Sequence, residues 1–134
     1  MRVMLDTNIL YSAFVFPNSA SNRLLHSIAD NYPILLSTAT LAEMAAVVLR
    51  KEPRLLIGID TFLMTFPYET VYTPTEITET ELFKIRDPKD YKILYSAIVG
   101  MADVFVTGDK DFMDVQIDFP EICTPRDFML KYLS

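Results

Sequence analysis

The sequence predicts an α/β sandwich built around a mainly parallel β-sheet. Short apolar runs, such as Val3–Leu5 and Ile34–Leu36, are hydrophobic on successive residues, as expected for strands covered on both faces. Between these runs lie longer segments whose apolar residues recur at the 3.6-residue period of a helix. With 134 residues, the chain is expected to form one domain over residues 1–134, with a core that needs no disulfide.

The predicted elements alternate along the chain. After Val3–Leu5, apolar residues up to Phe16 predict a short helix that stops at Pro17, and a second helix ends near Pro33. A polar segment at 37–40 directly follows the second strand and begins the third helix. The later predicted elements are a helix over 55–66, a strand over 68–72, a weak helix over 78–84, a helix through 93–101, a strand over 103–106, a strand near 122–123 and a C-terminal helix after Thr124.

Net charge and composition limit the classes of partner. The formal net charge of −6 argues, taken globally, against a polyanion such as nucleic acid. The hydrophobic share of 51% is slightly high for a globular chain, so apolar surface is expected to remain for a partner, with a homodimer as the default. Cys123 is alone, and no apolar run approaches the roughly 20 residues that span a bilayer. We therefore expect a soluble, cytoplasmic protein with no membrane partner.

Four acids fall at comparable places in this pattern. Asp6 follows the first strand and Asp109 the fourth, while Glu43 and Asp90 lie early in helices. Because the carboxyl ends of parallel strands share one edge of a sheet, at least Asp6 and Asp109 are expected to gather there. Mg²⁺ and Mn²⁺ prefer oxygen ligands, and two such ions can activate water and stabilise the leaving oxygen in phosphodiester cleavage.

Each of these acids also has an interpretation that needs no metal. Asp6 and Asp109 are of a type favoured at helix N-caps. Glu43 fits the acid of a capping box that would start at Thr40, and Asp90 fits an acid in the first turn of a helix that begins at a proline. Spacing alone leaves the capping and metal-binding interpretations open.

Other chemistries have little support in the sequence. His26 is the only histidine and lies in an apolar helical pattern, which argues against zinc hydrolysis and two-histidine ribonuclease chemistry. The chain has only three glycines and no phosphate-binding loop of either nucleotide-binding pattern. It also lacks a nucleophile-elbow sequence for a serine hydrolase.

Taken together, four segments resemble the PIN-domain nucleases, and most closely the VapC-type toxins of bacteria and archaea. The segments are LDTNIL at 5–10, STATLAEM at 37–44, RDPKDYKILYSAI at 86–98 and VTGDKDF at 106–112. The resemblance covers essentially the whole chain and implies a PIN-like, three-layer α/β/α fold. It further implies an endoribonuclease that uses Mg²⁺ or Mn²⁺ to cleave single-stranded RNA. It also implies an antitoxin protein that covers the site.

Carried over by position, the resemblance implies which residues form the site. The catalytic, metal-binding carboxylates would be Asp6, Glu43, Asp90 and Asp109. The supporting residues would be Thr7, Asn8, Thr107 and Asp111.

The segment after RDPK departs from the pattern expected in this branch. Two successive acids are expected there, whereas this chain has Asp90 followed by Tyr91. We expect Asp90 to be the ligand; if Tyr91 stood at that place, the site would be weakened. The alternative function is therefore a weak or inactive PIN-like module that binds RNA or protein. A phosphatase with a related fold is disfavoured, since its phosphoaspartate chemistry needs an acid where this chain has Asn8.

The cations of the chain are grouped, which answers part of the charge objection. Two bound divalent ions would bring the formal charge from −6 to −2. Two groups of basic residues are candidates for binding RNA phosphates, one near Asp90 and one at the end of the third predicted helix. The alternative is that they are ordinary solvated charges paired with Glu79, Glu81 and Glu52. The first group is Lys84, Arg86, Lys89 and Lys92, and the second is Arg50, Lys51 and Arg54.

The predicted helix over 55–66 is apolar on nearly every side. Such a helix is either buried in the core or covered by a partner. It is therefore our candidate for a dimer or antitoxin surface, with plain core as the competing interpretation.

Overall fold

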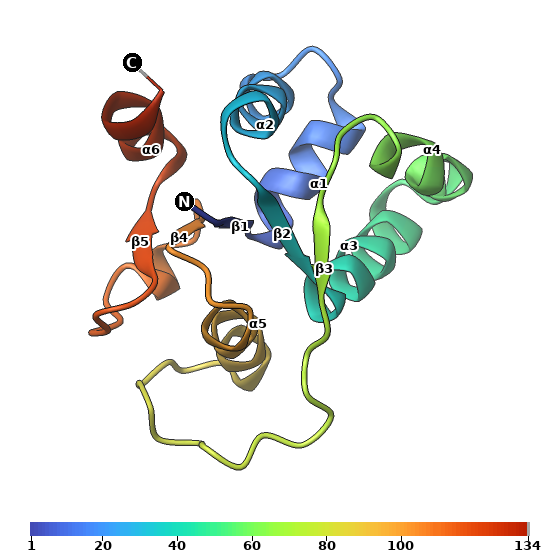
Figure 1. Ribbon diagram of the computed structural model, residues 1–134. Coiled ribbons are helices and arrows are strands. Elements are labelled where there is room, and N and C mark those ends of the chain that lie inside the picture. The colour runs from blue at the N-terminus through green and yellow to red at the C-terminus, as the bar shows by residue number, and fades with distance from the viewer. Residues whose placement is uncertain (134) are drawn as a thin grey trace.

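The computed structural model describes residues 1–133, which form a fully parallel five-stranded sheet of strand order β3-β2-β1-β4-β5 (Figure 1). The strands are β1 (Val3–Leu5), β2 (Ile34–Ser37), β3 (Glu69–Val71), β4 (Val104–Val106) and β5 (Glu121–Cys123). The helices are α1 (Thr7–Val15), α2 (Ala20–Asn31), α3 (Thr38–Lys51), α4 (Ile59–Leu63), α5 (Pro88–Val99) and α6 (Pro125–Tyr132), with 3₁₀ helices η1 (Pro53–Gly58) and η2 (Lys110–Phe112).

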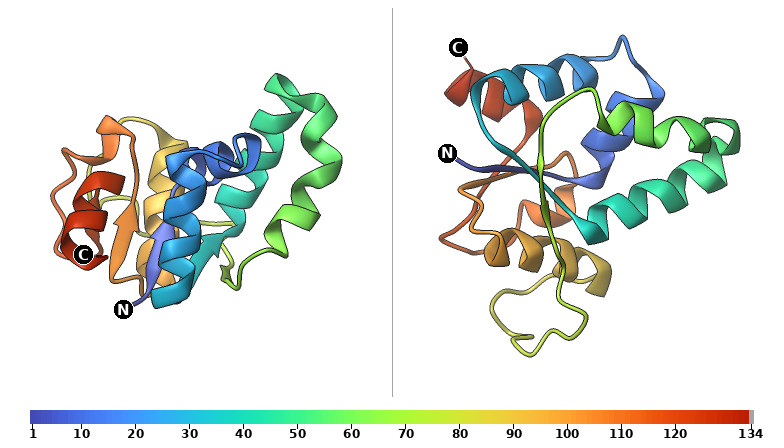
Figure 2. Two further views of the ribbon diagram at one scale, coloured as in Figure 1. Left: turned by 90° about the horizontal axis from the view of Figure 1, so that it is seen from above. Right: turned by 45° about the vertical axis from the view of Figure 1, so that its right-hand side comes forward.

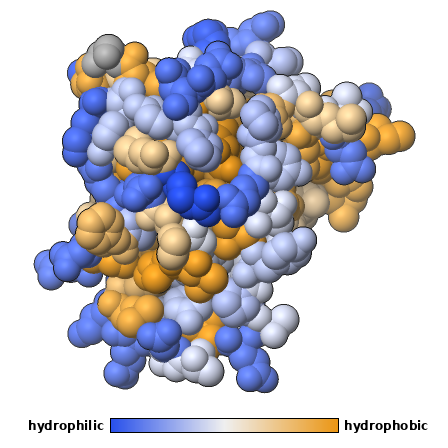
Figure 3. Space-filling view, in the orientation of Figure 1, coloured by the Kyte–Doolittle hydropathy of each residue, from blue (hydrophilic) through white to orange (hydrophobic). Residues whose placement is uncertain are grey.

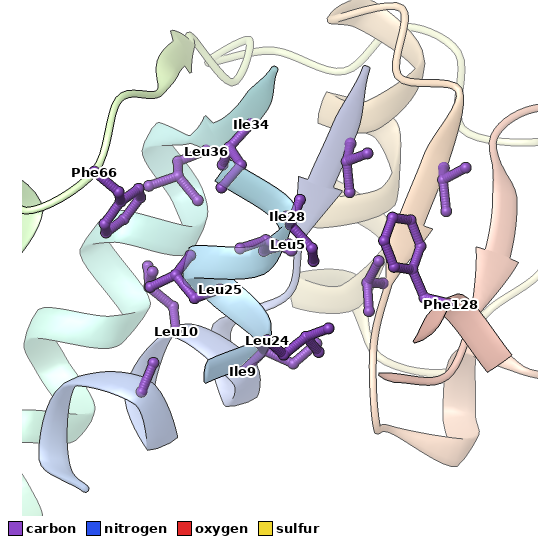
Figure 4. Packing of buried hydrophobic residues seen from close by; sticks show 14 of the residues in the cluster. Leu5, Ile9, Leu10, Leu24, Leu25, Ile28, Ile34, Leu36, Phe66 and Phe128 are labelled. Atoms are coloured by element: carbon purple, nitrogen blue, oxygen red, sulfur yellow. The ribbon is translucent and has the colours of Figure 1, made fainter. Parts of the chain in front are cut away.

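Two apolar clusters cover the two faces of this sheet. Because successive strand residues point to opposite faces, Val3 and Leu5 belong to one cluster and Met4 to the other. The first cluster packs under α1, α2, α3 and α6, as Figure 4 shows for the side chains around Leu5. The second packs under α5 and η2. The predicted three-layer α/β/α fold is confirmed, and every strand that was predicted is present.

The central position of β1 brings chemically important residues together. Its neighbours are β2 and β4, with Leu5 in register with Val106. The ladder continues one step beyond the strand, since the Asp6 backbone N–H donates to the Val106 carbonyl at 3.0 Å. Asp6 therefore lies beside Thr107 at the carboxyl edge of the sheet.

The weak helix predicted over 78–84 is absent, and that prediction was wrong. Residues 72–87 instead form a long loop that leaves β3 and passes around α5 (Figures 1 and 2). Four threonines and Pro74 in the segment give little intrinsic helix stability. The loop is held by apolar side chains that pack on the α5 cluster, among them Ile77, Phe83 and Ile85.

The prediction of one continuous helix over 55–66 was also wrong. Pro53 starts the 3₁₀ helix η1, and only the five residues of α4 are α-helical. Phe66 is buried in the core, whereas Ile57 is 93% and Met64 85% exposed, with Leu55 and Leu56 partly exposed. Figure 3 shows apolar side chains at the surface at this end of the molecule. The segment is thus part core and part apolar surface.

None of the helices in residues 1–133 has the length and apolar character needed to cross a membrane.

Candidate metal centre

Asp6 is the buried anchor of the site. It is 3% exposed and caps α1, its Oδ1 accepting from the Thr7 backbone N–H at 2.7 Å. Its Oδ2 accepts from the Thr107 hydroxyl at 2.6 Å. The same hydroxyl oxygen accepts from the Asp109 backbone N–H at 3.0 Å, so Thr107 connects the ends of β1 and β4.

Burial raises the pKa of Asp6 to about 6, and the hydrogen bonds from Thr107 and Thr7 offset part of this shift. The negative charges of Glu43 and Asp109 raise the pKa further. These two acids, from α3 and from the turn after β4, therefore lie close enough to repel Asp6 electrostatically.

Asp90 completes this group from the first turn of α5. The helix begins with Asp87 as N-cap and Pro88 at its first position, which places Asp90 in the first turn. Desolvation raises the pKa of Asp90 to about 6, and the charges of Asp87, Asp109, Asp6 and Glu43 add to the shift. The four acids that the sequence singled out therefore converge on one region.

Three carboxylates are especially close. One oxygen each from Asp90, Asp109 and Asp111 lies within 4.8 Å of the other two. Asp109 caps η2 by accepting from the Asp111 backbone N–H at 2.9 Å, which orients the Asp109 side chain. An all-oxygen donor set without histidine or cysteine, as these residues form, fits a hard divalent cation.

The position of Tyr91 resolves the ambiguity after RDPK. Its hydroxyl donates to the Glu79 carbonyl at 2.6 Å and accepts from the Leu82 N–H at 3.2 Å. Its ring stacks on Phe83 with the centroids 4.2 Å apart. Tyr91 therefore faces the 72–87 loop, and Asp90 is the residue that lies among the acids.

Residues 2–111 match the family model of the PIN domain. The chain belongs to the PIN-domain family. Nuclease activity is accordingly the general activity that the family supports for it.

Two solved structures show the same fold. One is VapBC2 from Rickettsia felis bound to a DNA fragment from their promoter, with a TM-score of 0.69, 22% identity, 92% coverage of this chain and 98% of that chain. The other is VapC20 of Mycobacterium tuberculosis, described as a sarcin-ricin loop cleaving toxin, with a TM-score of 0.59, 11% identity and coverage of 83% and 92%. A comparison with curated proteins found no match.

Some of the acids that the sequence allowed as helix caps do cap helices in this PIN domain, and others do not. Glu43 is not the acid of a capping box, because the N-cap of α3 is Ser37, whose hydroxyl accepts from the Thr40 N–H at 3.0 Å. Asp6 and Asp109 do cap helices, as does Asp87. For Asp6 and Asp109, capping and clustering coexist, since the cap hydrogen bond leaves carboxylate lone pairs for other partners.

The remaining predicted residues lie around this centre. Asn8 is exposed on the first turn of α1, and the Thr7 hydroxyl is buried without a hydrogen-bond partner among residues 1–133. Arg86 pairs with Asp111 at 3.5 Å, between Nη2 and Oδ2. The alternative interpretation, in which the cations near Asp90 pair with Glu79 or Glu81, is not found in the described part of the chain. Its three ion pairs are Arg2–Glu69, Arg86–Asp111 and Lys131–Glu121.

Sequence reasoning missed the structural use of Tyr91. Tyr91 and Tyr95 are four residues apart and share one face of α5, so their rings stack with centroids 6.2 Å apart. The four-residue spacing of the two tyrosines was visible in the sequence. Phe83, the stacking partner of Tyr91, was not identified because it lies in the loop that had been predicted as a helix.

Proposed function

We propose that this chain is an Mg²⁺- or Mn²⁺-dependent endoribonuclease and the toxin of a toxin-antitoxin pair. The observation that carries the proposal is the convergence of Asp6, Glu43, Asp90 and Asp109. The charges of Glu43 and Asp109 raise the pKa of both Asp6 and Asp90, and the charge of Asp6 raises that of Asp90. The family supports a nuclease, and the toxin VapC20, which is described as cleaving the sarcin-ricin loop, supports RNA as the substrate.

The acids would hold the ions, and the surrounding residues would control the acids. A bound divalent ion supplies an activated water and stabilises the leaving oxygen. Asp6 is held in one orientation by Thr7 and Thr107, and Asp90 by the capped first turn of α5. Burial, with a smaller contribution from neighbouring negative charges, raises the pKa of Asp6 and of Asp90 to about 6, so ion binding near that pH would displace protons from these two carboxyls.

An antitoxin partner and a homodimer belong to the same proposal. VapBC2, whose fold this chain shares, is a complex bound to promoter DNA. The exposed apolar surface formed by Leu55, Leu56, Ile57 and Met64 offers a place for protein contact.

The alternative function, an inactive RNA- or protein-binding module, depended on the doubt about Asp90. The position of Asp90 among the other acids, with the Tyr91 hydroxyl bound to the 72–87 loop, supports the nuclease over a weak or inactive module.

The test is cleavage of a mixed panel of single-stranded RNAs in Mg²⁺, Mn²⁺ or EDTA. We expect cleavage with a divalent ion, none in EDTA, and a loss of more than about 100-fold in Asp6→Asn and Asp90→Asn. Asp30→Asn is the matched control, because Asp30 is an exposed acid on α2. Cleavage that persists in EDTA, or full activity of Asp6→Asn, would overturn the mechanism.

A further inference from the structure

Three hollows on the surface adjoin one another around the first turns of α5. The first, about 280 Å³, is lined by Glu43, Lys89 and Lys92 together with apolar residues of α3 and α5. The second, about 340 Å³, shares Lys92 with the first and also contains Arg86 and Tyr91. The third, about 830 Å³, shares Arg86 and Tyr91 with the second and ends at Lys84. We call these three adjoining hollows, from Glu43 to Lys84, the α5 groove.

The α5 groove concentrates positive charge in an acidic chain. Its lining carries four exposed cations, although the formal net charge of the chain is −6. One of them, Arg86, also reaches Asp111 of the acidic cluster, so the groove and the cluster meet. The four cations are Lys84, Arg86, Lys89 and Lys92.

The outer wall of the groove is the 72–87 loop, and Tyr91 fastens that loop to α5. The Tyr91 hydroxyl binds two backbone groups of the loop, the Glu79 carbonyl and the Leu82 N–H. The Tyr91 ring lies between α5 and Phe83, which is only 6% exposed. Without helical hydrogen bonds of its own, the loop depends on such tethers to keep Lys84 and Arg86 in place.

We propose that the α5 groove binds the backbone of the single-stranded RNA on one side of the scissile phosphate, and that Tyr91 is the positioning residue that holds its wall. This inference rests on the proposed ribonuclease function. Phosphates of an extended strand would meet Lys92, Arg86 and Lys84 in turn, and sequence-independent backbone contacts of this kind fix the register of a strand. Glu81, which also lines the groove, would oppose binding by repelling the phosphates.

RNA binding tests the groove independently of cleavage. The probe is a fluorescein-labelled oligouridylate, titrated by anisotropy in EDTA at several salt concentrations. We expect Lys84→Gln and Lys92→Gln each to weaken binding several-fold and to reduce the slope of log Kd against log salt by about 0.7, the value for one phosphate contact on a single strand. Glu81→Gln should tighten binding.

The matched control is Arg126→Gln, which removes the same charge from the exposed first turn of α6, on the opposite face of the sheet from α5. Binding in Arg126→Gln should equal wild type. Unchanged affinity and salt slope in both lysine variants would overturn the proposed role of the groove in RNA binding, even if the protein cleaves RNA. Groove-dependent binding without cleavage under any metal would instead overturn only the proposed function.

Tyr91→Phe tests the wall, because it keeps the ring stack and removes both hydroxyl hydrogen bonds. We expect faster amide hydrogen exchange over residues 79–83, a Kd for RNA raised about as much as in Lys84→Gln, and a higher KM with kcat retained. Tyr72→Phe is the control, since Tyr72 is 77% exposed at the start of the same loop. Faster exchange in Tyr91→Phe with unchanged Kd and KM would overturn the positioning role.

Discussion

Asp6 combines two uses of a carboxylate that the sequence had presented as alternatives. It caps α1 through Oδ1 and faces the other acids of the site while its Oδ2 accepts from Thr107. A carboxylate buried to this degree is destabilised in its charged form unless hydrogen bonds or a cation compensate it. The pKa of Asp6 stays raised, at about 6, because the hydrogen bonds from Thr107 and Thr7 only partly compensate the cost of burying its charge when no ion is bound.

The raised pKa predicts how stability changes with pH in the metal-free protein. The ordinary pKa of Asp6 is 3.8 and its folded value is about 6, so its contribution to stability is full below pH 3.8 and is lost as pH rises through 6. A shift of about two units corresponds to a loss of at most about 3 kcal/mol. Urea unfolding in EDTA between pH 4 and 7.5 checks this.

The informative quantity in that experiment is the difference between wild type and Asp6→Asn. Asn does not titrate, so we expect the free energy of unfolding of the wild type to fall relative to that of Asp6→Asn as pH rises. A difference that stays constant over the whole range would contradict a raised pKa at Asp6.

The hydroxyl of Thr107 is expected to contribute both to the stability of the protein and to metal binding. Thr107→Val keeps the shape but removes the donor to Asp6 Oδ2 and the acceptor for the Asp109 N–H. We expect destabilisation of about 1–3 kcal/mol, because buried polar groups lose their partners. We also expect weaker Mn²⁺ binding, measured by calorimetry. Thr107→Ser should restore most of both, and failure of Ser to do so would show that the methyl group is what matters.

At the scale of elements, the strands were predictable because continuous apolar runs are typical of parallel strands that are covered on both faces. The 72–87 loop was not, since its shape depends on contacts with α5 that lie outside its own sequence. The packing of β3 on the end of α5 is another such contact, and it rests on the absence of a side chain at Gly100. A Cβ there would lie 2.8 Å from Val71 Cγ2 and 3.2 Å from the Ser96 carbonyl oxygen.

This packing predicts opposite outcomes for two glycine substitutions. Gly100→Ala should destabilise the protein by about 1–3 kcal/mol, because Val71 is buried and the helix backbone cannot move aside easily. Gly58→Ala should be neutral or slightly stabilising, since a Cβ at Gly58 would meet only the Phe14 ring at an ordinary 3.7 Å. Thermal unfolding of both variants checks this, and equal melting temperatures would contradict the close contact at Gly100.

At the scale of the whole molecule, the apolar surface of η1 and α4 is the candidate contact region for a second copy or an antitoxin. Ile57 is 93% exposed, so Ile57→Asp should change folding stability by no more than about 0.5 kcal/mol. If the protein is a homodimer through this surface, light scattering should show Ile57→Asp as a monomer with wild-type secondary structure.

The control for that experiment is Phe119→Asp, since Phe119 is 72% exposed just before β5. Its oligomeric state should match wild type. If the wild type is a monomer, the dimer prediction is wrong. If only Phe119→Asp dissociates the dimer, the interface has been assigned to the wrong surface.

The sequence by itself determined the parallel α/β/α fold and the four acids. Apolar strands that end on polar residues can only place those residues at the carboxyl edge of a sheet, so Asp6 and Asp109 were assigned to that edge without coordinates.

The tertiary structure decided what local spacing could not. Whether Asp90 or Tyr91 faces the acids depends on the rotation of α5 about its axis. The packing of its buried residues Ile93, Leu94 and Ala97 on the sheet residues Met4, Leu35 and Phe105 sets that rotation. Whether Glu43 belongs to a cap depends on where α3 begins, which the Ser37 hydrogen bond fixes. Both answers come from contacts between segments far apart in the chain or from the register of a helix start, and the 3.6-residue pattern alone specifies neither.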